Sequence, residues 1–413
     1  MISKTLRIAY LIIFLSLVGC ADLTSFLSTL TPATPSQSTA THQISATETQ
    51  TPPSLVEPQI LRVWLPPHFD PNTDTDSAAL LRRRLADFQS SHRGLKIEVR
   101  IKAAEGKASL LNSLSVTSIA APSAVPDLIA LSRVDLESAA SAGLLRPMDG
   151  LSTLLEDPNW YAFARELGHV QNIGYGLPFA ADALVLIRHP DFEIHTWADI
   201  LAIGNRLFLP QDNSRSLALL SFYISAGGKV VNEQGLPILE EQPLGRMLTL
   251  FHDGLESGTF SASVFESSGE QASEAGAERM IINWAVNNWT PGKNVMQPIP
   301  GEGASPHAFA NGWMWALAGS APENQQVATE LAEFLMEDAF LNEWTRELGY
   351  LPTRITTADG QNEELKVVLE AAQVLPPDEV VLTLGPILNQ AVSRVLHGEP
   401  VELVVRDVIQ QIQ

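Results

Sequence analysis

The chain has 413 residues, 45% of them hydrophobic, and a formal net charge of −21 at pH 7. A surface this acidic repels phosphate backbones and anionic lipid headgroups, so nucleic-acid binding and peripheral membrane binding are not expected. The single cysteine excludes a disulfide within the chain. A folded body of roughly 350 residues is larger than one core usually organises, so we expect two domains.

The first residues predict export. Lys4 and Arg7 precede an apolar run, residues 8–18, that is too short to span a bilayer and is typical of a secretory signal. The run ends in Leu-Val-Gly-Cys (17–20), which resembles the lipobox of bacterial lipoproteins. This resemblance implies that residues 1–19 are removed and that Cys20 carries lipid, which anchors the protein to a membrane. The alternative is an ordinary signal with an incidental cysteine.

Residues 20–58 are predicted to form a disordered tether. Their composition turns to Ser, Thr, Pro and Gln, which cannot bury enough apolar surface to offset the chain entropy lost on folding. A flexible chain of this length reaches on the order of 35 Å. That reach would let the folded body meet a partner in the same membrane. The alternative, that the tether only holds the folded body clear of the envelope surface, fits the same segment equally well.

Strand and helix patterns alternate from residue 60 onward. Strands are predicted at residues 60–65, 95–101 and 126–131, and helices after Asp76 and over residues 134–142. This alternation predicts a mostly parallel sheet with helices on its faces. Ligands gather beyond the carboxyl ends of strands in such sheets. Four candidate residues lie at or just after the ends of the predicted strands: Trp64, His68, Arg133 and Asp135.

The stretch 174–187 divides the folded body. Gly174, Gly176 and Pro178 indicate a turn, and the apolar run 183–187 predicts a strand covered on both faces. Asp182 is the only charged residue of the stretch. A carboxylate beside a buried strand either caps the turn or contacts a ligand, and both interpretations stay open here.

The second half keeps the same pattern. Helices are predicted over residues 197–207, 216–226, 244–254, 325–337, 340–348, 384–397 and 401–412, and strands at 280–283 and 312–317. A calcium loop is not expected at Asp70, Asn72, Asp74 and Asp76, despite their every-second-residue spacing, because Thr75 and Leu81 replace its glycine and glutamate. We expect neither a metal nor a cofactor.

The order of several short phrases resembles that of the extracellular solute-binding proteins of ABC importers. The similarity is closest to the carbohydrate-binding family 1, of maltose-binding type. The phrases are Val-Pro-Asp-Leu-Ile (125–129), Ala-Gly-Leu-Leu-Arg-Pro-Met-Asp (142–149), Tyr-Gly-Leu-Pro-Phe (175–179), Thr-Trp-Ala-Asp-Ile (196–200), Ser-Ala-Gly-Gly-Lys (225–229), Arg-Met-Ile-Ile-Asn (279–283), Gly-Tyr-Leu-Pro (349–352) and Val-Leu-His-Gly (395–398).

The resemblance implies an α/β fold like that of periplasmic binding proteins. Each of two lobes would hold a mostly parallel sheet with flanking helices, and the ligand would lie in a cleft between them. Lobe 1 would comprise residues 59–179 and 310–351, and lobe 2 residues 180–309 and 352–413. The chain would cross between the lobes near residues 178–183, 298–312 and 350–354.

The candidate ligand residues follow from the chemistry of a sugar. A sugar ring presents C–H groups that stack on an aromatic ring and hydroxyls that pair with polar side chains. The aromatic candidates are Trp64, Trp284, Trp289, Trp313 and Tyr350, and the polar ones are His68, Arg133, Asp135, Asp182 and Arg215. Core packing is the alternative for each tryptophan, and it is the expectation for Trp160, Trp197, Trp315 and Trp344.

Two departures from the family's pattern imply a reshaped pocket. Trp284 replaces a small residue after the Ile-Asn pair, and the aromatic residue commonly found near Gly385 is missing.

These observations predict a lipid-anchored binding protein on the extracytoplasmic face of a bacterial membrane, at the cell surface or in the periplasm. As a monomer without catalytic activity, it would deliver a small polar solute, first of all a carbohydrate, to the permease subunits of an ABC importer. One alternative is a tethered glycoside hydrolase with Asp135 and Asp182 as paired carboxylates. Another is a solute sensor or adhesion lipoprotein with the same fold, and the solute could also be a polyamine.

Overall fold

The computed structural model describes residues 59–413 except 205–206, 211–214, 261–279, 287, 291, 320–321, 359–362 and 413. All of these described residues belong to one compact unit, Val56–Gln413. The predicted signal and tether, including Cys20, lie outside the described residues. Within the described part, no helix is both long and apolar enough to cross a membrane.

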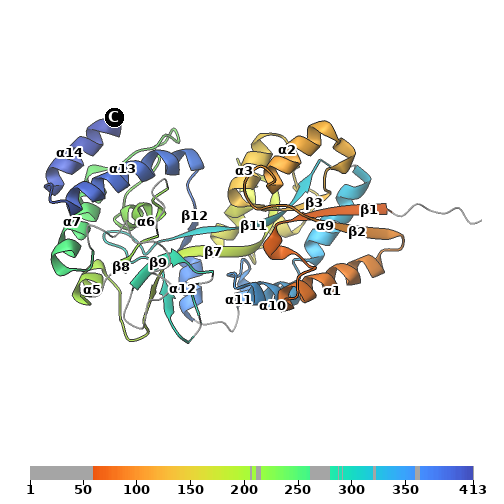
Figure 1. The fold of residues 1–413 in the computed structure, drawn as a ribbon, viewed down its shortest axis with the longest axis horizontal. Helices are drawn as coiled ribbons and strands as arrows, with labels where there is room; N and C mark the ends of the chain where they lie inside the picture. The colour runs from red at the N-terminus through yellow and green to blue at the C-terminus, as the bar shows by residue number, and fades with distance from the viewer. Residues whose placement is uncertain are drawn as a thin grey trace, which may run out of the picture. The chain divides into compact units, whose positions relative to one another are not determined.

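A ten-stranded mixed sheet runs through the described part (Figure 1). Its main path is β2 (Leu95–Ile101), β1 (Gln59–Leu65), β3 (Leu128–Ser132), β11 (Ala308–Ala318), β7 (Gly176–Arg188), β9 (Met280–Trp284) and β8 (Leu207–Phe208). Three further strands join it: β10 (Val295–Gln297) on β7, and β4 (Leu145–Arg146) and β12 (Ala372–Val374) on β11. A separate hairpin pairs β5 (His169–Val170) with β6 (Ile173–Gly174).

The sheet differs from the two mostly parallel sheets that were expected. Pairing is parallel for β1 with β2 and β3, for β8 with β9 and for β11 with β12, whereas β11 is antiparallel to β3 and β7. The long strands β7 and β11, of 13 and 11 residues, pair with each other and with neighbours on either side. The two halves therefore share one hydrogen-bonded sheet.

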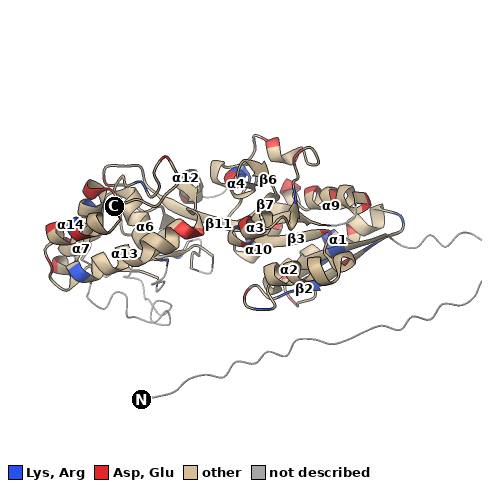
Figure 2. Ribbon diagram, turned by 90° about the horizontal axis from the view of Figure 1, so that it is seen from above, with Lys and Arg blue, Asp and Glu red and all other residues tan. Residues whose placement is uncertain are grey.

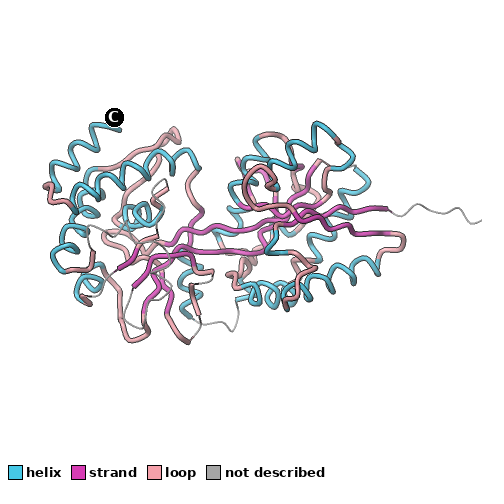
Figure 3. The backbone as a smooth tube through the Cα atoms, viewed as in Figure 1, coloured by secondary structure: helices cyan, strands magenta, loops and turns pink. Residues whose placement is uncertain are grey.

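Helices lie on both sides of these strands (Figure 3). They are α1 (Asp76–Ser91), α2 (Leu110–Ala120), α3 (Arg133–Ser141), α4 (Ala162–Leu167), α5 (Trp197–Ala202), α6 (Leu217–Ser225), α7 (Glu241–Ser257), α9 (Pro322–Phe334), α10 (Asp338–Leu348), α11 (Ile355–Ala358), α12 (Glu363–Ala371), α13 (Asp378–Leu396) and α14 (Val401–Ile412), with short 3-10 turns η1 (Pro67–Phe69), η2 (Pro122–Ala124) and η3 (Leu154–Glu156). The helix predicted over residues 197–207 ends at Ala202, because Leu207 pairs with Met280 of β9.

The loop before α1 satisfies its own polar groups. Thr75, the N-cap of α1, accepts a hydrogen bond from the backbone N–H of Ala78 at 3.2 Å. Asp70 accepts one from the backbone N–H of Asn72 at 2.9 Å. These hydrogen bonds are typical of a turn followed by a helix N-cap.

Two apolar cores pack against the sheet. The first gathers β1, β3, α1, α9 and α10, and the second gathers α5, α6, α7, α13 and α14. Leu365 and Val368 of α12 belong to the first core, although the sequence assigned residues 352–413 to the second lobe. The tryptophans expected in packing are buried, with 5% or less of each residue exposed: Trp160, Trp197, Trp315 and Trp344.

Charged residues are spread over many helices (Figure 2). On α7, His252, Asp253 and Glu256 place possible ligand atoms within 4.8 Å of one another, but all three residues are exposed. Exposed acidic groups often lie this close without a metal ion, so the arrangement does not indicate a site.

His307 is a buried titratable residue just before β11. Only 1% of it is exposed, its ring meets Phe309 edge-on, and neither ring nitrogen has a hydrogen-bond partner among the described residues. Burial lowers the pKa of His307 to about 4, because a charged imidazolium would lose its hydration there.

This burial predicts a loss of stability in acid. The unfolded chain takes up a proton at His307 below about pH 6.5, whereas the folded protein does so only near pH 4, so stability falls as the pH drops through this window. Between pH 7 and 5 the residue should account for about 2 kcal/mol of the loss. Urea denaturation of the wild type and His307→Gln at both pH values measures it, and parallel losses in the two proteins would contradict it.

Candidate functional site

The pairing of β7 with β11 determines which side chains share a face of the sheet. Asn311 lies opposite Asp182, and Trp313 lies opposite Ala180. On the other edge of β11, Ser132 of β3 lies opposite Trp313. Because directly opposed residues of an antiparallel pair project to the same face, the carboxyl of Asp182, the amide of Asn311 and the indole of Trp313 share one face.

Tyr350 joins this face from a different segment. Leu351 exchanges two backbone hydrogen bonds with Ala181, at 2.7 and 3.0 Å, so its neighbour Tyr350 falls on the Asp182 face. The Trp313 side chain lies close enough to the Tyr350 hydroxyl to lower its pKa, against the larger effect of burial. The ring of His68, in η1, lies 4.6 Å from that of Trp313 and 6.4 Å from that of Tyr350 between centroids.

We call these five residues, Asp182, Asn311, Trp313, Tyr350 and His68, the Asp182 strip. The sequence predicted four of them. Asn311 was missed, although a single amide inside the apolar run of β11 is the kind of signal that could have found it, once β11 was paired with β7.

Asp182 is half-buried and held by backbone groups. Its Oδ1 accepts hydrogen bonds from the N–H of Ala183 at 2.8 Å and of Val286 at 3.0 Å. Burial raises the pKa of its carboxyl to about 7, although these N–H groups act in the opposite direction. Near neutral pH both protonation states are therefore populated, so the side chain can donate as well as accept a hydrogen bond.

The other titratable groups of the strip are neutral at physiological pH. Burial raises the pKa of Tyr350 to about 12 and lowers that of His68 to about 4. The strip thus combines aromatic surfaces with uncharged donors and acceptors and one carboxyl group. This combination suits a solute that has hydroxyl groups and an apolar ring face.

The remaining aromatic candidates occupy three different places. Trp284 lies opposite Leu184, on the Asp182 face, and packs half-buried against the second core. Trp289 follows β9 and packs half-buried against the first core. Trp64 is only 1% exposed inside the first core, with the Lys102 ammonium 4.8 Å from its ring. The structure therefore contradicts a ligand role for Trp64, since a ring this buried cannot meet a solute.

Arg133 and Asp135 form local contacts at the start of α3, next to Ser132, which lies opposite Trp313. The Arg133 guanidinium donates to the carbonyl oxygens of Leu167 at 3.1 Å and His169 at 2.5 Å, so it ties α3 to the end of α4. Asp135 lies in the first turn of α3, where its N–H donates to the Ser132 hydroxyl at 3.3 Å, and burial raises its pKa. These contacts of both residues stabilise the local fold around α3.

Arg215 contacts α13, a helix of the second core. Its guanidinium pairs with Asp378, at the start of α13, at 2.8 Å. A Cβ on Gly385 of α13 would lie only 2.3 Å from the Arg215 carbonyl oxygen. This close approach explains the missing aromatic side chain near Gly385, because the position has no room for one.

Gly385→Ala is accordingly expected to destabilise the protein by at least about 1 kcal/mol, since the strain of overpacking exceeds the helix propensity gained. Thermal or urea unfolding measures the change. Gly245→Ala in α7 is the matched control, because a methyl group added there would have no atom of the described residues within 4 Å and the same propensity gain applies. Equal or higher stability of Gly385→Ala would contradict the packing described here.

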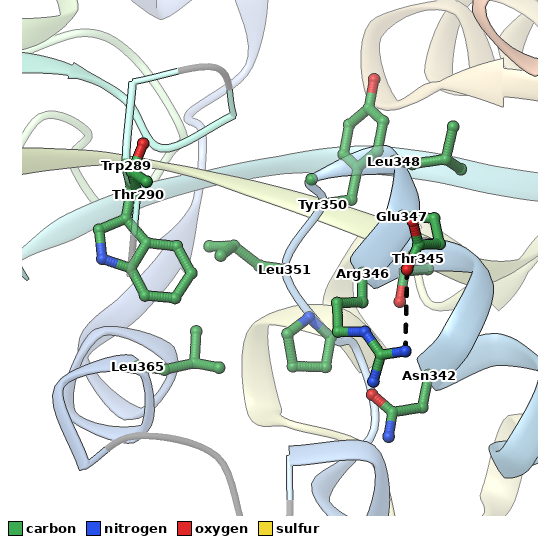
Figure 4. A pocket seen from close by; sticks show the side chains of 12 residues that line it. Trp289, Thr290, Asn342, Thr345, Arg346, Glu347, Leu348, Tyr350, Leu351 and Leu365 are labelled. Carbon is green, nitrogen blue, oxygen red and sulfur yellow. Dashed lines mark ion pairs between the residues drawn. The ribbon is translucent and has the colours of Figure 1, made fainter. Parts of the chain in front are cut away.

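A pocket of about 440 Å³ lies beside residues 349–352 (Figure 4). Its lining comes from α10, α12, the segment 349–352 and the loop after β9: Trp289, Thr290, Asn342, Thr345, Arg346, Glu347, Leu348, Gly349, Tyr350, Leu351, Pro352 and Leu365. We call it the α10 pocket. In Figure 4, Trp289 faces Arg346 and Asn342 across the pocket, and the Tyr350 hydroxyl points away from them.

One protein-family model matches most of the chain. Residues 83–366 match the family model of the bacterial extracellular solute-binding proteins. The chain belongs to this family. The matching group is family 8, whereas the motif order suggested family 1. Family membership places this solute-binding protein outside the cytoplasm and makes it a binding protein rather than an enzyme, so the hydrolase alternative is dropped. No curated protein matches the chain.

Solved structures confirm the α/β fold. A cyclic alpha-maltosyl-1,6-maltose binding protein from Arthrobacter globiformis matches with a TM-score of 0.67 and 15% identity, over 86% of this chain and 98% of that one. The sugar-binding protein MalE from Xanthomonas citri matches with a TM-score of 0.67 and 16% identity, over 86% and 96%. UgpB from Mycobacterium tuberculosis, in complex with glycerophosphocholine, matches with a TM-score of 0.60 and 14% identity, over 86% and 97%.

Proposed function

We propose that this solute-binding protein captures a small carbohydrate at the Asp182 strip and delivers it to an ABC importer. The observation that carries the proposal is the joining of Trp313 and Tyr350 with the Asp182 carboxyl and the Asn311 amide on one face of the sheet. The aromatic rings can stack on the C–H face of a sugar, while the carboxyl and amide pair with its hydroxyls.

The electrostatics of the strip favour an uncharged solute. Tyr350 and His68 are neutral near pH 7, and Asp182 is only partly ionised. A polyamine would need several full carboxylates to compensate its charges, because a buried unpaired ammonium is costly. Solved proteins of this fold include a maltose-bound protein, a maltodextrin-binding protein and a complex with glycerophosphocholine.

The strip lies between the two apolar cores along the sheet. On the Asp182 face, Phe309 and Leu184 belong to the second core, whereas Trp313 packs against the first. We propose that the cores mark two lobes and that a bound solute favours the arrangement in which both contact it. A lipid on Cys20 would keep the monomeric protein at the membrane, where the permease subunits would accept the loaded form.

A thermal-shift screen against mono- and oligosaccharides, polyols, glycerophosphodiesters and polyamines tests this function. We expect a neutral carbohydrate to raise the melting temperature in a concentration-dependent way and to change the tryptophan fluorescence. Stabilisation by polyamines alone would replace the carbohydrate with a cationic solute, and a flat response across the whole panel would contradict the proposal.

A further inference from the structure

Residues 349–352 have different surroundings on their two sides. The ring of Tyr350 belongs to the Asp182 strip, where it contacts Trp313 and His68. Leu351, on the opposite face, is 2% exposed and lines the α10 pocket. One short segment is therefore part of both the strip and the pocket.

Both walls of the α10 pocket are bonded to β7 at the residues that flank Asp182. Leu351 exchanges hydrogen bonds with Ala181 on one side. On the other, Ala285 donates to the Ala183 carbonyl at 2.8 Å and accepts from the N–H of Trp289 at 2.9 Å. Val286, in this same loop, donates to the Asp182 carboxylate. A change in the separation of these two segments would therefore move the backbone around Asp182.

The α10 end of the pocket is also hydrogen-bonded to the segment that carries Tyr350. The backbone N–H of Tyr350 donates to the Thr345 carbonyl at 2.9 Å, and the hydroxyl of Thr353 donates to the Pro178 carbonyl at 2.8 Å. These bonds fix the segment between α10 and β7. A ligand that displaced the last turn of α10 would therefore also displace the Tyr350 ring.

The lining of the α10 pocket suits a small amphiphilic molecule. The half-buried indole of Trp289 supplies most of the apolar surface, and Leu351 and Leu365, each no more than 2% exposed, add little to it. Polar groups of Thr290 and Asn342 lie at the rim. The volume of about 440 Å³ is within the range of small-molecule sites.

The charges at the rim compensate each other. Arg346 and Glu347 form an ion pair at 3.8 Å, with side chains 64% and 39% exposed (Figure 4). This ion pair has no net charge, and the net charge of the chain, −21, disfavours anions. We therefore expect the pocket to select an uncharged ligand.

We propose that the α10 pocket is a second binding site, for a neutral molecule with one apolar ring and a few hydroxyl groups, and that its occupation changes the solute affinity of the Asp182 strip. The claim that the α10 pocket binds a ligand depends on the pocket alone. The claim that this ligand changes the solute affinity rests on the proposed function. The coupling follows from the shared segment and from the two walls bonded beside Asp182.

The test uses the full chain labelled with 5-fluorotryptophan and observed by fluorine NMR, with the Trp289 resonance assigned from Trp289→Phe. The neutral probe is 4-hydroxybenzyl alcohol, and the anionic 4-hydroxybenzoate has the same ring. We expect a saturable shift of the Trp289 resonance with the neutral probe, and at least tenfold weaker binding of the anion. A saturating amount of the neutral probe should change the dissociation constant of the solute at least fivefold.

Two phenylalanine variants of α10 provide the matched comparison. Asn342 lines the pocket, whereas Glu343 is exposed and outside the lining. Asn342→Phe should abolish the Trp289 shift and Glu343→Phe should preserve it. A missing shift, a shift that survives Asn342→Phe, or an unchanged solute affinity would overturn the proposal. If no solute binds the strip, the proposed function fails, and the Trp289 titration still decides whether the pocket binds.

Discussion

Replacing Arg354 by alanine is expected to lower the free energy of unfolding by about 3–5 kcal/mol. The Arg354 side chain is only 7% exposed and donates to Asp157 and Asp338, each at 2.8 Å. Its guanidinium also lies 5.0 Å from the centre of the Trp160 ring. The substitution removes the charge that pairs two carboxylates and breaks the links that Arg354 makes to the start of α10 and to the loop after η3. Urea denaturation followed by circular dichroism measures the loss.

Arg346→Ala is the matched control for Arg354→Ala. Its side chain is 64% exposed and its ion pair with Glu347 is long, at 3.8 Å, so the loss should be at most about 1 kcal/mol. Similar losses in the two variants would show that the Arg354 contacts do not hold the segment that carries Tyr350.

Asp182→Ala is expected to weaken solute binding by about 1.5–3 kcal/mol, the value of a hydrogen bond to a charged group. The carboxyl lies between Asn311 and Tyr350 on the strip, and burial raises its pKa to about 7. Isothermal titration calorimetry with the solute found by thermal-shift screening measures the difference. Unchanged affinity would remove Asp182 from the site.

Asp182→Asn separates ligand contact from local structure. An asparagine retains an oxygen that can accept from the N–H groups of Ala183 and Val286, which alanine cannot do. The asparagine variant should therefore fold like the wild type and lose affinity only to the extent that the carboxylate itself binds the solute. If alanine abolished binding and asparagine had no effect, Asp182 would act as a local cap and not as an ionised ligand group.

The sequence predicted the secondary-structure elements better than the directions of their side chains. The apolar runs at β3, β7 and β9 and the Thr196 cap of α5 are local patterns, and the structure confirms them. Trp64 was placed at a strand end by the same kind of pattern, yet its ring is inside the first core. Strand position alone does not show which face is covered, because that depends on neighbouring strands.

Long-range pairing explains the other differences. Asn311 can be recognised as a site residue only from its register with Asp182, which is far away in the sequence. Arg133 could be placed near a strand end, but its bonds to the carbonyls of Leu167 and His169 depend on where α4 packs. Similarly, α12 was predicted in lobe 2 because it follows the crossing at residues 350–354, but it packs in the first core. Such contacts are set by tertiary packing, which a local pattern does not record.

The most direct test of the central claim, that the solute binds on the Asp182 strip, is a calorimetric titration of Trp313→Ala beside Phe192→Ala. Both residues are half-buried aromatics, but Phe192 packs against the second core outside the strip. Loss of a stacking ring should weaken binding by at least about tenfold in Trp313→Ala, whereas Phe192→Ala should stay within about twofold of the wild type. Equal affinities in the wild type and both variants would contradict binding on the strip.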